Sequence, residues 1–162
     1  HYGKFSGVTD YIAMIGKTGA DLDEKSGYYG ERLVLKAQEL GLNTCWVAMT
    51  YSKVKTAFTI DSGEKLCIVI SLGYGKTKGV PHKSKSADAV TKADGSVPGW
   101  FRKGTEAALL APTAMNQQKF LFTLNGNKVS AKAGFGFYSK IDLGIVKYHF
   151  EIGAGKENFQ WA

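Results

Sequence analysis

Apolar residues divide the chain into segments of two kinds, those with a helical repeat and those that are β-rich or continuous. Residues 8–15 are β-rich and predict a strand. Residues 26–40 carry apolar side chains every three or four positions and stop at Gly41, which predicts a helix capped by Ser26. A short apolar segment, residues 43–49, follows this helix.

The middle of the chain combines one strong strand signal with a long stretch that has no apolar repeat. Residues 65–72 are almost continuously apolar and have the length of a strand, which predicts a buried central strand. Residues 73–97 are rich in glycine, lysine and serine and predict a long loop.

The last third of the chain predicts helix, turn, hairpin and helix. Residues 100–110 form the first predicted helix, which Pro112 stops, and residues 113–118 form a polar turn. A hairpin is predicted over residues 119–133 around Asn125-Gly126-Asn127. Asp142 is the predicted N-cap of a final helix that runs through residue 152.

The first and last predicted helices share part of their apolar pattern. The matched pairs are Leu33 with Ile145, Val34 with Val146, Leu40 with Ile152, and Gly41 with Gly153. Chance and an internal duplication both explain such a pattern. A duplication would require an element like residues 111–122 upstream of the first strand, and hence a segment before His1.

Composition adds that the chain is globular. Its 162 residues, 44% of them hydrophobic and 12% aromatic, suffice for a core and argue against disorder. The longest apolar run, residues 66–72, is too short for a membrane helix, which needs about 20 residues, and no signal peptide opens the chain. Two isolated cysteines, Cys45 and Cys67, argue against a disulfide scaffold and against a zinc site and predict a cytoplasmic protein.

The net charge of +7, from 21 basic and 14 acidic residues, raises the hypothesis of a nucleic-acid adaptor. The lysines are scattered, however, and no RNA-recognition, zinc-finger or helix-turn-helix spacing occurs. The densest basic stretch, residues 75–85, is either a solvated loop or a phosphate site for a small ligand.

Known catalytic and nucleotide motifs are missing. Gly75-Lys76-Thr77 follows a strand, but Ile70 stands where a P-loop needs glycine. Gly153-Ala154-Gly155 closes a helix instead of opening one, so it is no dinucleotide fingerprint. No nucleophile elbow accompanies a histidine, and His149 is expected to be a core or interface residue. The sequence therefore favours chemistry carried by a bound cofactor.

The string Ala111-Pro-Thr-Ala-Met-Asn-Gln-Gln118 clusters hydroxyl and amide groups beside an apolar helix end. It is either a polar connection or a contact for a polar ligand. The string resembles the Pro-Ser-x-x-Asn-x-Gln signature of the nitroreductase-like flavoproteins. The segments 30–46, 65–74 and 83–85 are similar to further motifs of that family, in the same order.

The resemblance extends over about residues 8–155 and is strongest to a thermophile-type subgroup with both half-sites on one polypeptide. It implies an α+β fold, a mixed sheet flanked by helices in a pseudo-dimeric, two-half arrangement. The chain would be a single domain, with a first half of about residues 1–97 and a second of about 98–162.

The resemblance also implies FMN as cofactor and assigns residues to it by matching positions. Pro112, Thr113, Ala114 and Asn116 would contact the ribityl chain and ring edge. Trp46, Val47, Ala48 and Met49 would line the isoalloxazine, with a backbone N–H of that stretch near flavin N5. Lys83 and Lys85 would hold the phosphate. No catalytic side chain and no metal ligand is assigned.

One family motif is absent. The family opens with an Arg-x-Ser segment at the phosphate and pyrimidine side of the flavin, but the arginines here are Arg32 and Arg102. Lys4 is expected to lie near the flavin ring instead. With a first residue of His1 instead of Met, this leads us to expect that an N-terminal segment of the family is missing.

The expected function is FMN-dependent NAD(P)H oxidoreduction of nitroaromatic, quinone or similar acceptors by ping-pong hydride transfer. The alternatives are a flavin-binding module with little turnover, for storage or sensing, and a basic nucleic-acid adaptor. Expected partners of the oxidoreductase are NAD(P)H and a small aromatic acceptor, with neither nucleic acid nor membrane. The protein would be a monomeric pseudo-dimer or a homodimer.

Overall fold

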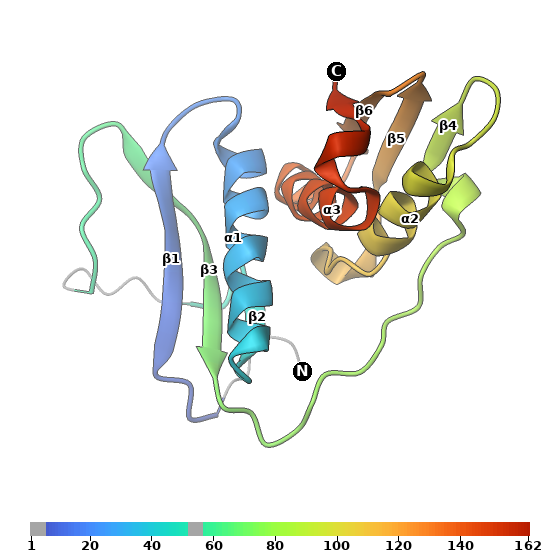
Figure 1. Cartoon of the computed structure of the whole chain (residues 1–162). Coiled ribbons are helices and arrows are strands. Elements are labelled where there is room, and N and C mark those ends of the chain that lie inside the picture. The colour runs from blue at the N-terminus through green and yellow to red at the C-terminus, as the bar shows by residue number, and fades with distance from the viewer. Residues whose placement is uncertain (1–5, 52–56) are drawn as a thin grey trace. The chain divides into compact units, whose positions relative to one another are not determined.

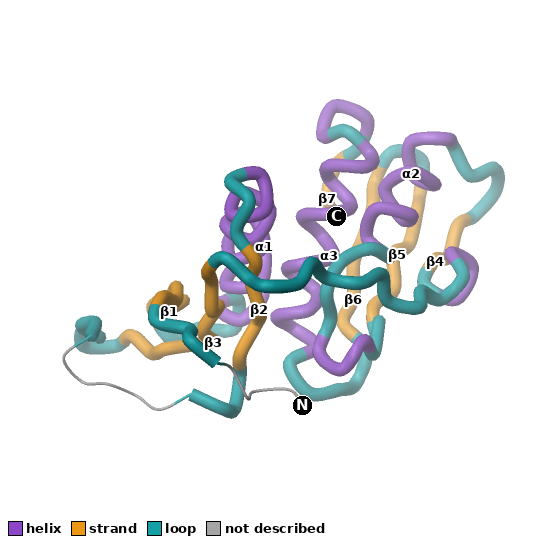
Figure 2. Tube along the Cα trace, turned by 90° about the horizontal axis from the view of Figure 1, so that it is seen from below, coloured by secondary structure: helices purple, strands orange, loops and turns teal. Residues whose placement is uncertain are grey.

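The structure, a computed structural model, describes residues 6–51 and 57–162. The chain divides into two compact units, His1–Val80 and Pro81–Ala162, each with its own sheet (Figures 1 and 2). Lys4 lies outside the described residues. No helix among the residues described is both long and apolar enough to cross a membrane.

The first unit is a three-stranded antiparallel sheet with one helix on its face (Figure 1). Its elements are β1 (Asp10–Lys17), α1 (Leu22–Glu39), β2 (Asn43–Val47) and β3 (Glu64–Gly73). Strand β3 lies between β1 and β2, and its Ile70 is fully buried and pairs with Ile12 and Trp46. The prediction of a buried central strand is confirmed.

Helix α1 begins earlier than predicted, at Leu22, and Ser26 is buried inside it and does not cap it. Leu22 is buried, and Asp23 and Glu24 occupy the first turn, where carboxylates interact favourably with the helix N-terminus. The sequence pattern missed this start because the first turn is largely acidic and shows little of an apolar repeat.

The buried face of α1 also differs from the predicted one. Val34 and Ala37 are buried, but Leu33 and Leu40 are 43% and 62% exposed. The charged Glu31 is 1% exposed instead. A pattern of apolar residues cannot reveal this, because a carboxylate is normally expected outside unless it has partners.

The second unit places two packed helices against a four-stranded mixed sheet. Its helices are α2 (Gly99–Ala108) and α3 (Ser139–Ala154), with short 3-10 turns η1 (Ala87–Ala89), η2 (Ala114–Asn116) and η3 (Lys156–Asn158). Its strands are β4 (Thr91–Ala93), β5 (Phe120–Asn125), β6 (Lys128–Ala133) and β7 (Gln160–Trp161), in that order across the sheet. The pairs β4–β5 and β6–β7 are parallel, and the hairpin β5–β6 is antiparallel.

Aromatic side chains form the core of the second unit. Phe150 on α3 lies 4.6 Å, ring centroid to centroid, from Phe122 on β5 and 5.6 Å from Phe101 on α2. It also contacts Phe159 and Trp161 at the end of the chain, at 5.2 and 5.5 Å. Because such rings bury large apolar areas, this cluster joins both helices to the sheet.

Two further predictions for the second unit are wrong in part. The predicted loop 73–97 contains η1 and β4, because Val90 is fully buried and residues 91–93 pair with β5. Helix α3 begins at Ser139, so Asp142 lies in its first turn and is not its N-cap. For β4 the deciding partner, strand β5, lies about 30 residues further along the chain.

The two units share one sequence of elements, although their sheets differ. In each, a strand leads into a helix that is followed by a glycine with positive φ and then a strand. Those glycines are Gly41 (φ 79°) and Gly155 (φ 75°), whereas the apolar pattern of the sequence aligned Gly41 with Gly153. The left-handed region favours glycine, which explains why both helices end there.

Candidate functional site

The polar turn that follows α2 has an unusual backbone. Met115, Asn116 and Gln118 have positive φ angles of 51°, 52° and 45°. Residues other than glycine rarely adopt this conformation, which costs about 1–3 kcal/mol at each position. Such strain persists only where the surroundings hold it, and it concentrates at functional sites.

Hydrogen bonds hold this turn against the segment around Lys83. The side-chain amides of Asn116 and Gln118 both donate to the carbonyl oxygen of Lys83, each at 2.8 Å. The Gln118 side-chain oxygen accepts from the backbone N–H of Lys85 at 2.8 Å. Two stretches about 30 residues apart in the sequence are thereby joined side by side.

The Lys85 ammonium group adds to this connection. It donates to the carbonyl oxygens of Gln117 and Gln118, both at 3.0 Å. His82 and Ser84 fix the same segment from its other side, since His82 Nε2 and Ser84 Oγ both lie within 3.0 Å of the Leu109 carbonyl oxygen. The segment 82–85 is thus tied to the end of α2 and to the turn.

A buried carboxylate lies under the turn. Asp142 Oδ1 accepts from the backbone N–H of Ala114 at 2.9 Å, and Oδ2 accepts from the side-chain amide of Gln117 at 2.7 Å. The Asp142 residue is 4% exposed. Burial raises the pKa of its carboxyl group, and the two hydrogen bonds oppose that rise.

The remaining predicted residues, 46–49, belong to the first unit. Trp46 lies on β2, and its indole N–H donates to the Glu31 carboxylate at 3.2 Å. Val47 is buried, whereas Met49 is exposed. The large indole fits against α1 only because position 30 is glycine: a Cβ there would lie 2.3 Å from the Trp46 ring.

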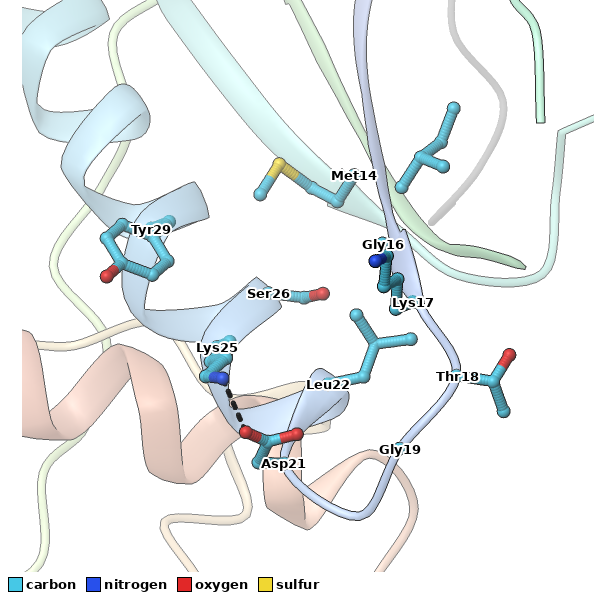
Figure 3. A pocket seen from close by; sticks show the side chains of 11 residues that line it. Met14, Gly16, Lys17, Thr18, Gly19, Asp21, Leu22, Lys25, Ser26 and Tyr29 are labelled. Atoms are coloured by element: carbon cyan, nitrogen blue, oxygen red, sulfur yellow. Dashed lines mark ion pairs between the residues drawn. The ribbon is translucent and has the colours of Figure 1, made fainter. Parts of the chain in front are cut away.

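A pocket of the first unit was not predicted from the sequence. It lies between the end of β1 and the start of α1, has a volume of about 420 Å³, and lies near an exposed ion pair of Asp21 with Lys25 (Figure 3). Met14, Leu22 and Tyr29 give it an apolar side. None of the predicted flavin residues lines it, and no sequence motif marked it.

Comparison with known proteins identifies the family. The sequence model of the family described as "Putative TM nitroreductase" matches residues 1–154. The chain belongs to this nitroreductase family. The resemblance inferred from the ordered motifs is confirmed.

A solved structure supports the nitroreductase-like fold. The chain is similar to the crystal structure of a putative nitroreductase from Thermotoga maritima, with a TM-score of 0.68 and 24% sequence identity. The likeness covers 88% of this chain and 59% of that one, so the chain spans about three fifths of the length of the protein it matches. The expected α+β, nitroreductase-like fold is confirmed. No curated protein matches the sequence.

Nitroreductase-family proteins typically bind a flavin. The hydrogen-bond donors of the second unit suit the polar ribityl and phosphate part of FMN. Thr113 Oγ1 accepts from the Gln118 N–H, which leaves its own hydroxyl proton for a ligand. Among the described residues, Asn116 uses one N–H of its amide on Lys83, and Lys85 uses two N–H groups on backbone carbonyls, so each keeps one donor for a ligand. Hydroxyl, amide and exposed ammonium donors suit a polyol chain that ends in a phosphate.

The structure thus brings together six of the ten predicted residues. Those in the second unit, on or beside the joined turn and basic segment, are Pro112, Thr113, Ala114, Asn116, Lys83 and Lys85. Trp46 and its three neighbours lie in the first unit. The sequence did not mark Asp142, Gln117 and Gln118 as parts of the arrangement, although the two glutamines stand inside the recognised string.

Proposed function

We propose that this chain is an FMN-dependent NAD(P)H oxidoreductase that reduces nitroaromatic compounds, quinones or similar small aromatic acceptors. The observation that carries the proposal is the strained turn 113–118, joined to Lys83 and Lys85 in a member of the nitroreductase family. When bound, FMN supplies the hydride chemistry, and the protein supplies binding and orientation.

In this proposal the residues of the second unit bind the tail of the flavin. Lys83 and Lys85 provide two positive charges for a phosphate of about −2. The Thr113 hydroxyl and the Asn116 amide donate to the ribityl hydroxyl groups, and Pro112 and Ala114 contact the ring edge. A lysine binds phosphate as a point charge, so geometric specificity comes from the turn.

The residues of β2 and its end are proposed to line the flavin ring. Trp46 and Val47 offer apolar surface, and a backbone N–H in the stretch up to Met49 would donate to the flavin N5 position. Such a preorganised donor stabilises developing negative charge without a titrating side chain. This accounts for the absence of a catalytic side chain from the proposal.

The experiment measures flavin and turnover together. Purified protein is incubated with FMN, desalted, and examined for flavin absorbance; NADH and NADPH oxidation is then followed with a nitroaromatic or a quinone. We expect a yellow protein that oxidises one of the two nucleotides only when the acceptor is present. Protein that retains no FMN would refute the proposal.

A second outcome of this experiment defines the alternative function. Tight FMN binding with negligible oxidation of NADH or NADPH would identify a flavin-binding module for storage or sensing. Size-exclusion chromatography with light scattering then separates a monomeric pseudo-dimer from a homodimer. A cytoplasmic location is part of the proposal and is supported by two free thiols, Cys45 and Cys67.

A further inference from the structure

One carboxylate holds both ends of the most strained part of the polar turn. The oxygens of Asp142 accept from the backbone N–H of Ala114 at 2.9 Å and from the side-chain amide of Gln117 at 2.7 Å. Between these two residues lie Met115 and Asn116, whose φ angles of 51° and 52° are left-handed. The carboxylate therefore bridges the start and the end of a left-handed dipeptide.

Gln117 extends this connection in two directions. Its side-chain amide also donates to the carbonyl oxygen of Phe137 at 2.7 Å, which ties the turn to the loop before α3. Its backbone carbonyl accepts from the Lys85 ammonium at 3.0 Å. The position of Gln117 therefore affects where the proposed phosphate ligand Lys85 lies.

Capping of its own helix does not explain this carboxylate. Helix α3 begins at Ser139, and the hydrogen bonds shown for the Asp142 side chain go to the turn 113–118. Both of those donors are uncharged, and no cationic partner for Asp142 occurs among the residues that the structure describes. Burying such a carboxylate is costly, and its place in the first turn of α3 offsets only part of the cost. The direction of its pKa agrees, since burial outweighs the two hydrogen bonds. The two hydrogen bonds to the strained turn explain a carboxylate at this position by geometry better than by stability.

We infer that Asp142 is a positioning residue of the proposed flavin site. By fixing Ala114 and Gln117 it holds Met115 and Asn116 in the left-handed conformation and sets the positions of the Asn116 amide and the Lys85 ammonium. The inference rests on the proposed function, because it assigns Asp142 to the site that binds the FMN tail. Asp142 itself does not contact the flavin in this scheme.

Two variants separate positioning from stability. Asp142→Asn keeps the size of the side chain but replaces one accepting oxygen with a donor, so one of its two hydrogen bonds is lost. Gln117→Ala removes the second hydrogen bond at a half-buried position and leaves the carboxylate in place. Asp88→Asn removes the same charge from an exposed position of the same unit and is the matched control.

The measurements are the Kd of the purified chain for FMN, from quenching of flavin fluorescence, and amide hydrogen exchange of residues 114–118 without FMN. We expect Asp142→Asn to raise the Kd about tenfold to a hundredfold, as the loss of a hydrogen bond to a charged group allows. Gln117→Ala should change it in the same direction, and Asp88→Asn should leave it unchanged. Backbone amides within residues 114–118 should exchange about tenfold faster in Asp142→Asn, whichever of the two hydrogen bonds is lost, with the α3 amides unaltered.

The outcomes distinguish the two proposals. Wild-type protein that binds no FMN refutes the flavin function, whereas the amide exchange of residues 114–118 still decides whether Asp142 holds the turn. A variant with a lower melting temperature but an unchanged Kd for FMN overturns the inference, because Asp142 would then serve stability alone. Unchanged exchange at residues 114–118 overturns it as well.

Discussion

The indole N–H of Trp46 donates a hydrogen bond to the Glu31 carboxylate, 3.2 Å away, and links strand β2 to helix α1. Glu31 is 1% exposed, so this polar contact lies inside the first unit. The contact joins a carboxylate on a helix and a tryptophan on a strand, and no apolar pattern in the sequence links these two residues. Trp46 is also the first of the residues proposed to line the flavin ring.

Replacing Glu31 should therefore destabilise the first unit. Glu31→Ala removes the acceptor and the buried volume, and we expect a loss of about 2–4 kcal/mol in the free energy of unfolding. Glu31→Gln keeps an accepting oxygen and should cost less. Urea denaturation measures both variants, and equal stabilities of Glu31→Ala and wild type would contradict the role given to this contact.

The close packing of α3 on α2 predicts that Gly153 cannot be enlarged. A Cβ at Gly153 would lie 2.5 Å from the Lys103 carbonyl oxygen and 2.6 Å from the Ala107 Cβ. Gly153→Ala should therefore lower the stability by about 1–3 kcal/mol through overpacking, despite the higher helix propensity of alanine. Gly99→Ala is the control, because nothing lies within 4 Å of a Cβ there. Thermal unfolding compares the two, and a Gly153→Ala variant at least as stable as the control would contradict the packing argument.

The basic segment makes a prediction about the phosphate. Lys83→Ala with Lys85→Ala should weaken FMN binding by about a hundredfold, since each removes a charge-assisted contact. Lys76→Ala with Lys78→Ala removes the same charge from the exposed stretch just before and should have little effect. Fluorescence titrations of both double variants at one salt concentration test this. Equal losses in the two would indicate a general charge effect and no phosphate site.

Asp142 predicts a pH dependence of stability. Burial raises the folded-state pKa of its carboxyl group above the ordinary value of 3.8, so the folded state binds this proton more tightly than the unfolded chain does. The stability that wild type gains relative to Asp142→Asn should be largest below pH 3.8 and should fall as the pH rises through the raised folded-state pKa. Urea unfolding of both proteins across this pH range measures the difference. A difference that grows with pH would reverse the sign and refute the burial argument.

Much of the secondary structure was predictable because its causes are local. The hairpin β5–β6 follows from two alternating segments around Gly126, which supplies the positive φ of 61° that a tight turn needs. The central strand β3 follows from its continuous apolar run. Strands β4 and β7, three and two residues long, carry no pattern of their own and exist because they pair with β5 and β6.

The residues of the candidate site were predictable from the sequence, but the hydrogen bonds that join them were not. The string 112–118 and the lysines 83 and 85 were recognisable because they match family motifs at ordered positions. The joining of Lys83 to Asn116, and the use of Lys85 on two backbone carbonyls, depends on contacts between distant segments. Such contacts leave no periodic signal in a single sequence.

The sequence by itself determined the family, the alternation of strands and helices and the residue types available to the proposed flavin, because these depend on local propensity and on ordered motifs. The tertiary structure decided where two of the buried carboxylates lie, Glu31 and Asp142. Glu31 and Asp142 read as ordinary surface or capping residues, yet both are buried and hydrogen-bonded to Trp46 and to the turn 113–118. The physical reason is that a carboxylate can be buried only where distant parts of the chain supply its donors, and only the folded chain brings those donors together.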